Sequence, residues 1–195
     1  MKKKVFAASV FLLCLAIMAG TTMAYFTASD TAHNVITSGN VDIQLVEKQD
    51  RNGTLVDYPD GPITGILPGE SVSKIVTVRN TGTGDAWVRV RVEKTVELDR
   101  KFAPEGTAAD PELMVLDFND EDWTQIGQWH YYRKPLTFGK STEPLFRKVT
   151  FAPEMDNPYQ ACTANVIVHA QAVQSKNNPL PAGGDFSKIP GWPEK

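Results

Sequence analysis

The feature that most constrains this chain is the alternation of apolar and polar residues in two long stretches. In the first, from residue 87 to 98, Val88 and Val90 alternate with Arg89 and Arg91. In the second, from residue 162 to 172, small or branched apolar residues alternate with polar ones. Side chains of a β-strand point alternately to its two faces, so each stretch predicts a long strand with one buried and one solvated face. The inward residues of the second stretch are small, which predicts bulky side chains opposite them.

Shorter stretches with strand-like patterns occur elsewhere along the chain, at residues 34–46, 71–78, 113–118, 129–134 and 145–151. A hairpin is predicted at Asn52-Gly53, because these residues tolerate the positive φ of a tight turn. A second hairpin is predicted at residues 80–85. About eight strands separated by turns predict an all-β fold, a jelly-roll-like antiparallel β-sandwich.

Helices are expected only as short insertions in this sandwich. Residues 99–112 and 119–126 are predicted as loops, each with a short helix. Residues 177–195 carry four prolines and Gly183-Gly184, which predicts a flexible, Pro/Gly-rich tail.

The first 24 residues have the features of a secretory signal peptide. Three lysines follow Met1, residues 5–18 are apolar, and Thr22-Met23-Ala24 is a small-residue ending that signal peptidases accept. Cleavage is therefore predicted between Ala24 and Tyr25. The apolar core is too short to span a bilayer by itself, so we expect a secreted protein that is not held in a membrane after processing.

The net charge and the cysteine content limit which functions the chain can have. The 195-residue chain has a formal charge of −3, and removal of the leader takes away three lysines and no acidic residue, which leaves −6. Such a chain without a basic run is not expected to bind nucleic acid. Its mature length suits one domain with a sizeable core. Cys14 leaves with the leader, so Cys162 remains alone and no intramolecular disulfide can form.

Two segments near the N-terminus carry a family resemblance. Residues 20–27, Gly-Thr-Thr-Met-Ala-Tyr-Phe-Thr, and residues 34–43, Asn-Val-Ile-Thr-Ser-Gly-Asn-Val-Asp-Ile, resemble the TasA/camelysin group of exported bacterial proteins. The likeness is specific over residues 1–46, moderate to residue 98 and looser beyond. It implies a jelly-roll sandwich that assembles into extracellular biofilm-matrix fibres. It also implies a leader that a SipW-type signal peptidase removes.

This resemblance implies how the subunits join. Residues 25–40 would form a donor segment that completes a sheet in the next subunit, and residues 41–176 would form the sandwich. Tyr25, Phe26, Val35 and Ile36 are the expected assembly residues. The partners would be further copies of the chain, in a head-to-tail polymer at the surface or in the matrix of a bacterium. Residues 25–37 could equally fold back onto their own domain, and the sequence does not separate these two arrangements.

Camelysin also carries a metallopeptidase label, which makes a zinc site the first alternative. The classical zinc-binding helix places two histidines four residues apart with a glutamate between them. His33, His130 and His169 do not have that spacing. We therefore expect no catalytic metal, no cofactor and no enzymatic activity. A secreted camelysin-like metallopeptidase and a monomeric surface-binding sandwich remain the alternative functions.

Three further patterns could carry chemistry. The run from Asp117 through Asn119, Asp120 and Asp122 starts like a calcium loop, but position six is Asp122 where such a loop requires glycine, so these residues are only weak calcium candidates. Cys162 begins a patterned strand on its apolar side, where cysteine usually acts as a small hydrophobe. The aromatic residues between 123 and 138 could form a glycan platform, but their alternation favours ordinary strand packing.

Overall fold

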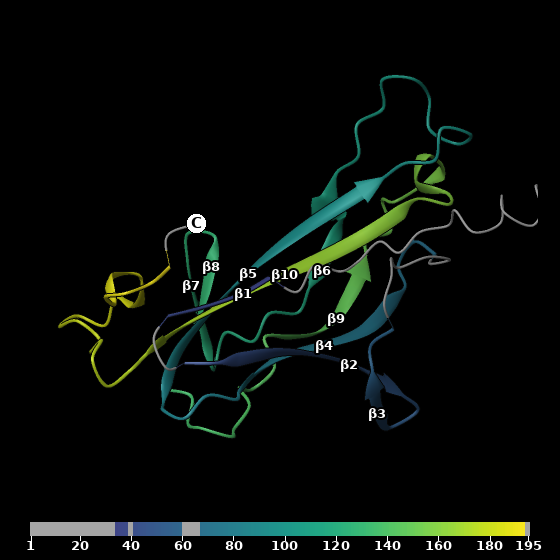
Figure 1. The fold of residues 1–195 in the computed structure, drawn as a ribbon. Helices are drawn as coiled ribbons and strands as arrows, with labels where there is room; N and C mark the ends of the chain where they lie inside the picture. Colours follow the sequence, from purple (N-terminus) through teal and green to yellow (C-terminus); the bar gives the residue numbers. More distant parts are fainter. Residues whose placement is uncertain (1–33, 39–40, 60–66, 194–195) are drawn as a thin grey trace, which may run out of the picture. The chain divides into compact units, whose positions relative to one another are not determined.

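The computed structural model describes residues 34–38, 41–59 and 67–193, and these residues form ten strands in two sheets (Figure 1). Helical structure in these ranges is limited to the short 3-10 turns η2 (Pro111–Leu113), η3 (Asn157–Tyr159) and η4 (Phe186–Lys188). The predicted all-β sandwich is therefore confirmed. Consecutive strands repeatedly cross from one sheet to the other, which gives the sandwich its jelly-roll-like connections.

Each sheet contains five strands. The strands of sheet A, in spatial order, are β1 (Asn34–Ser38), β10 (Thr163–Gln174), β5 (Ala86–Glu97), β8 (Trp129–Tyr132) and β7 (Trp123–Ile126). Those of sheet B are β3 (Thr54–Asp57), β2 (Ile43–Arg51), β4 (Ser71–Asn80), β9 (Phe146–Phe151) and β6 (Met114–Leu116). All pairings are antiparallel except that of β1 with β10.

The two stretches with the clearest alternation form the centre of sheet A. β5 and β10 pair antiparallel over twelve residues each, from Thr163 opposite Glu97 to Gln174 opposite Ala86. On their inner faces Val88, Val90 and Val168 are at most 1% exposed. Burying such side chains contributes about 1.5–3 kcal/mol each to the stability of the fold.

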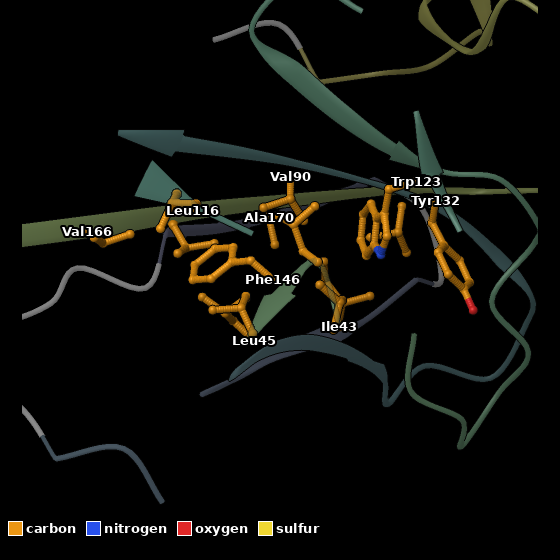
Figure 2. Close-up of a cluster of buried hydrophobic side chains, with 14 of the residues drawn as sticks. Ile43, Leu45, Val90, Leu116, Trp123, Tyr132, Phe146, Val166 and Ala170 are labelled. Atoms are coloured by element: carbon orange, nitrogen blue, oxygen red, sulfur yellow. The ribbon is translucent and has the colours of Figure 1, made fainter. Parts of the chain in front are cut away.

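The core lies between the two sheets and combines small residues on one side with large ones on the other. Ala164, Ala170 and Ala172 of β10 are fully buried. Figure 2 shows Ala170 and Val90 in the same cluster as Leu45 and Phe146 from sheet B. The prediction that bulky side chains face the small residues of β10 is therefore confirmed.

The structure corrects two predictions about connections. The strand-like stretch 34–46 forms two strands in different sheets, β1 in sheet A and β2 in sheet B. Residues 80–85 do not form a hairpin either, because β4 and β5 also belong to different sheets. The buried Asn80 side chain holds this crossing: its amide nitrogen donates to the carbonyls of Gly84 and Leu136, both at 2.8 Å.

Two predictions of irregular structure are also corrected. Within residues 119–126, expected as a loop with a short helix, the chain forms strand β7, which pairs with β8 across the turn at Gly127. The tail expected to be flexible packs on the outer face of sheet A. There Ile189 is 3% exposed and lies in a second small core with Trp87. The indole nitrogen of Trp87 donates to the carbonyl of Asn178 at 2.8 Å.

Candidate functional site

The edge of sheet A at β10 is the best candidate for a functional surface. On one side, β5 pairs with all twelve residues of β10. On the other side, β1 covers only five of them, from Asn34 opposite His169 to Ser38 opposite Val173. In the part of the chain that the structure describes, no strand pairs with residues 163–168 on this side. We call this side of the strand the β10 edge (Figure 1).

Strand β1, which pairs with the β10 edge, is held by few hydrogen bonds. β1 has five residues, and its pairing is parallel, which is slightly less stable per residue than antiparallel pairing. An uncovered edge also offers rows of backbone N–H and C=O groups that can pair with a strand from another chain. Among the described residues, positions 163–168 of the β10 edge therefore leave a row of backbone groups on this side that no strand pairs with.

The structure places two of the four predicted assembly residues at this edge. Val35 pairs opposite Ala170 and Ile36 opposite Gln171. Both belong to the same chain as β10, so the arrangement seen is the fold-back that the sequence left open. Tyr25 and Phe26, together with the predicted cleavage site after Ala24, lie outside the described residues.

The outer face of the sheet beside the β10 edge is charged. The Arg91 guanidinium lies 2.8 Å from a carboxylate oxygen of Glu93, and His169 Nε2 lies 3.5 Å from the same oxygen. Glu93 is half exposed on β5, next to the edge strand. A segment that enters the edge therefore meets a polar, mixed-charge face on one side and the apolar core on the other.

The predicted metal ligands are not brought together. His130 pairs opposite Val90, whose side chain is buried in the core, whereas His169 pairs opposite Arg91 on the outer face. The two described histidines therefore lie on opposite faces of sheet A. His130 is 5% exposed and stacks on Phe118, with ring centroids 4.2 Å apart. Burial lowers the pKa of His130, and the Asp120 carboxylate opposes that shift to a smaller extent.

Zinc therefore does not fit the residues that the structure describes. These residues contain no group of three or more His, Cys, Asp or Glu side chains placed to share a metal ion. His33, the third histidine, lies outside the described ranges. No catalytic step through a metal can be built from the described side chains.

The weak calcium candidates form a hydrogen-bonded turn. One carboxylate oxygen of Asp117 accepts from the backbone nitrogens of Arg147 and Lys148 at 2.9 and 2.8 Å. The Asn119 side-chain oxygen accepts from the backbone nitrogen of Asp122 at 3.3 Å, and its amide donates to the Asp122 carboxylate at 3.2 Å. The backbone carbonyl of Asp120 accepts a hydrogen bond from the Arg133 guanidinium at 3.0 Å. These bonds give the run a structural role in joining β6, β7 and β9.

Cys162 lies just before β10 and is half buried against the core. Burial raises the pKa of its thiol, which disfavours the reactive thiolate. The residue therefore behaves as the small hydrophobe that its position in the pattern predicts.

Sequence reasoning missed a cluster on the outer face of sheet A. The guanidinium of Arg89, predicted to face solvent, lies between two indole rings, 4.2 Å from the centroid of Trp129 and 4.6 Å from that of Trp192. Tyr131 is buried under the C-terminal tail, and its ring centroid lies 5.7 Å from that of Trp192. The large apolar residues Phe186, Ile189 and Trp192 were the available signal, because a solvated tail seldom carries three of them.

A second missed feature is a buried ion pair in sheet B. Lys74 and Glu47 are paired with both side chains almost fully buried, and the Lys74 ammonium lies 4.0 Å from the ring centroid of Tyr58. Burial lowers the pKa of Lys74, and Glu47 opposes that shift. This pair joins β2 to β4 in sheet B, whereas the β10 edge belongs to sheet A.

No helix in the described ranges has the length and apolarity to cross a membrane.

Comparison with known proteins gives one match. The family model described as camelysin metallo-endopeptidase matches residues 1–122, a range that ends after β6. No curated protein and no solved structure matches the chain.

Proposed function

This chain belongs to the camelysin metallo-endopeptidase family, and from that membership and the β10 edge we propose that it is a secreted structural subunit of an extracellular fibre. Subunits would join by donor-strand addition, in which the N-terminal segment of one copy pairs with β10 of the next. The expected setting is a bacterial biofilm matrix. The single observation that carries this proposal is the β10 edge, with its short parallel strand β1.

Export and assembly are linked in this proposal. A SipW-type signal peptidase would cut between Ala24 and Tyr25 and free residues 25–37 from the membrane. Before the cut, the apolar leader tethers this segment. N-terminal sequencing of the secreted protein should therefore begin at Tyr25, and a product that begins several residues away would contradict this step.

Exchange of the donor is chemically easy because the same hydrogen bonds form within one chain or between two. Each backbone hydrogen bond contributes about 0.5–1.5 kcal/mol net in either arrangement. Swapping an identical element between copies is therefore a low-cost route to association. Val35 and Ile36 would keep their register opposite Ala170 and Gln171, now of the neighbouring subunit.

A contact of this kind propagates without closing. The donor segment and the acceptor β10 are different surfaces of the same subunit, so each copy that donates a strand still offers its own edge. Head-to-tail contacts that do not close by rotation generate filaments. The proposed product is therefore an open fibre held by main-chain hydrogen bonds, with side chains in pockets giving specificity.

The test compares the mature chain with a variant that lacks residues 25–37. Negative-stain electron microscopy and sedimentation should show fibres for the mature chain and monomers for the deletion. Cooperative unfolding of the deletion variant would establish that it still folds. A synthetic peptide of residues 25–37 should raise its melting temperature, because the peptide fills the vacant β10 edge.

A second variant keeps the chain length. Val35→Asp places a carboxylate opposite Ala170, whose side chain is fully buried, and should impair fibre growth because a charge on the core side of the sheet is costly. Normal fibres from the deletion variant would exclude donor-strand addition. A mature chain that stays monomeric at all concentrations would favour a monomeric surface-binding sandwich.

A secreted metallo-endopeptidase is the second candidate, because the family to which the chain belongs is described as camelysin metallo-endopeptidase. The described histidines, on opposite faces of sheet A, speak against a shared zinc ion. Proteolysis of a denatured protein substrate should be measured with and without a chelator, beside His130→Ala and His169→Ala. Chelator-sensitive cleavage that either substitution abolishes would establish the peptidase and refute the purely structural role.

A further inference from the structure

A cavity of about 470 Å³ opens at the start of β10, at the end of the sandwich. Its lining is mainly apolar and includes Phe151, Met155, Tyr159, Cys162 and Ala164. Polar groups stand among them, since Asp156, Asn157 and Gln160 also line it. An apolar cavity of this size with a few polar groups is typical of a site that binds a specific ligand or side chain.

The register of β1 points at this cavity. Asn34 lies opposite His169, and the pairing is parallel, so each residue toward the N-terminus moves one residue back along β10. Continued at this register, the segment before Asn34 runs along residues 163–168 of the β10 edge. It would place Ala28 opposite Thr163 and Tyr25 opposite Gln160. The nine residue steps from Asn34 to Tyr25 would span roughly 30 Å as extended strand.

The ladder ends where the cavity begins. β10 starts at Thr163, and Ala161 just before it has φ of +56°, outside the extended region. An incoming strand therefore loses its partner after Ala28. Its first three residues, 25–27, extend past the end of β10, over the cavity wall.

We propose that this cavity receives the Tyr25 side chain of a neighbouring subunit, and this inference rests on the donor-strand function proposed above. The inward-facing residues of β10 are the even-numbered ones, including Ala164, and Cys162 packs toward the same core. At this register Ser29 would lie opposite Ala164 and share its face. Residues two apart in an extended segment share a face, so Thr27 and Tyr25 would also point to the side of Ala164 and Cys162, and Phe26 would point the other way.

The chemistry of the cavity suits tyrosine. The ring meets Phe151 and Met155 on the apolar wall, and the hydroxyl meets the amides of Asn157 or Gln160. Buried tyrosines usually need such a partner for the hydroxyl. Cleavage before Tyr25 also creates a positive α-amino group, and Asp156 supplies a negative charge at the cavity.

Disulfide trapping tests the position directly. Thr27 would be the first residue beyond the last ladder pair, Ala28 with Thr163, and Cys162 directly precedes Thr163. One step past the ladder, the two Cα atoms stay near the 4.8 Å spacing of neighbouring strands, within the separation that a disulfide accepts. Thr27→Cys in the secreted mature chain should therefore form a disulfide with Cys162 on mild oxidation, giving a ladder of covalent multimers in a non-reducing gel. The oxidation is run at alkaline pH, because burial raises the pKa of the Cys162 thiol. The matched control is Thr31→Cys, predicted about 13 Å from Cys162 along the strand, which should give no ladder. Adding Cys162→Ser to Thr27→Cys should abolish the ladder.

The outcomes separate this inference from the proposed function. Fibres in the microscope with no disulfide from Thr27→Cys overturn the cavity assignment and leave donor-strand addition intact. If the thiols of Cys162 and the introduced cysteine both disappear but no ladder forms, the disulfide has formed within one chain. That result would place Tyr25 in its own chain and overturn assembly between subunits. A ladder from Thr31→Cys as strong as that from Thr27→Cys refutes the register.

A second measurement isolates the Tyr25 side chain. Tyr25→Ala should raise the critical concentration for fibre growth, measured by light scattering, at least tenfold, because it removes a buried aromatic ring. Phe26→Ala is the matched control and should change it by less than about threefold. Equal effects of the two substitutions would contradict the assignment of Tyr25 to the cavity.

Discussion

Arg89 donates two hydrogen bonds to the side-chain oxygen of Gln171, from Nε at 2.8 Å and from Nη2 at 2.6 Å. The two residues lie opposite each other on β5 and β10, and both are largely buried on the outer face of sheet A. This polar pair links the strand that carries the acceptor edge to the strand at the centre of the sheet. The tail also contacts this pair, because the backbone carbonyl of Pro193 accepts a further hydrogen bond from Arg89 at 3.1 Å.

Removing this pair should destabilise the fold. Arg89→Ala leaves the Gln171 oxygen buried without its donor, and we expect a loss of about 2–3 kcal/mol in the free energy of unfolding, measured by urea denaturation. Arg91→Ala is the matched control, since its ion pair with Glu93 is partly solvated and should change stability by about 1 kcal/mol or less. Equal effects would show that burial of the Arg89 pair has no energetic consequence.

The tail should contribute to stability. Trp192→Ala removes a ring that contacts Arg89 and Tyr131, and we expect a loss of about 1–3 kcal/mol. Lys188 has an exposed side chain in the same tail, so Lys188→Ala should change the free energy of unfolding by no more than about 0.5 kcal/mol. A truly flexible tail would give no difference between these two variants in thermal or urea unfolding.

A charge in the centre of the core should be poorly tolerated. Val90 is fully buried, so Val90→Asp places a carboxylate among apolar side chains and should cost more than about 3 kcal/mol. Val115→Asp introduces the same group on β6 at a position that is 53% exposed. That control should unfold cooperatively near the parent midpoint, whereas Val90→Asp should fail to fold or unfold at much lower denaturant.

Stability should fall on acidification because of His130. Its pKa in the fold is lowered below the ordinary value near 6.5, so the unfolded chain binds a proton first as the pH falls. Above about pH 6.5 both states are neutral at this residue and it contributes no pH dependence. Below that value the unfolded state gains stability until the folded imidazole also titrates.

The measurement is the free energy of unfolding at pH 8 and at pH 5.5. His130→Asn should show a smaller difference between the two values than the parent protein does. Identical differences in the two proteins would mean that other groups cause the acid sensitivity.

Local patterns in the sequence predicted strands well where one face is buried. The alternation around Val90 and around Val168 located β5 and β10 to within a residue or two. Asn52-Gly53 predicted its turn correctly, since both residues have positive φ, 54° and 85°. These features depend on neighbours in the chain and on a single buried face, which is the information that periodicity contains.

Sheet membership depends on tertiary packing and could not be predicted in the same way. The polar turn after Asn80 has the composition of a hairpin, yet it carries the chain from sheet B to sheet A. Alternation shows which residues face inward but not which sheet they belong to. The same limit applies to the β10 edge, because the pairing of Val35 with Ala170 joins residues far apart in the sequence. The burial of Trp87 under the tail likewise depends on a distant segment.

The parallel pairing of β1 with β10 would also set the mechanical response of a fibre. Tension along the strand direction pulls two parallel neighbours past one another, so all the backbone hydrogen bonds between them carry the load together. A pull across the strands would instead open them one at a time from an end. A fibre built through the β10 edge would therefore resist stretching along its strands far better than it resists peeling.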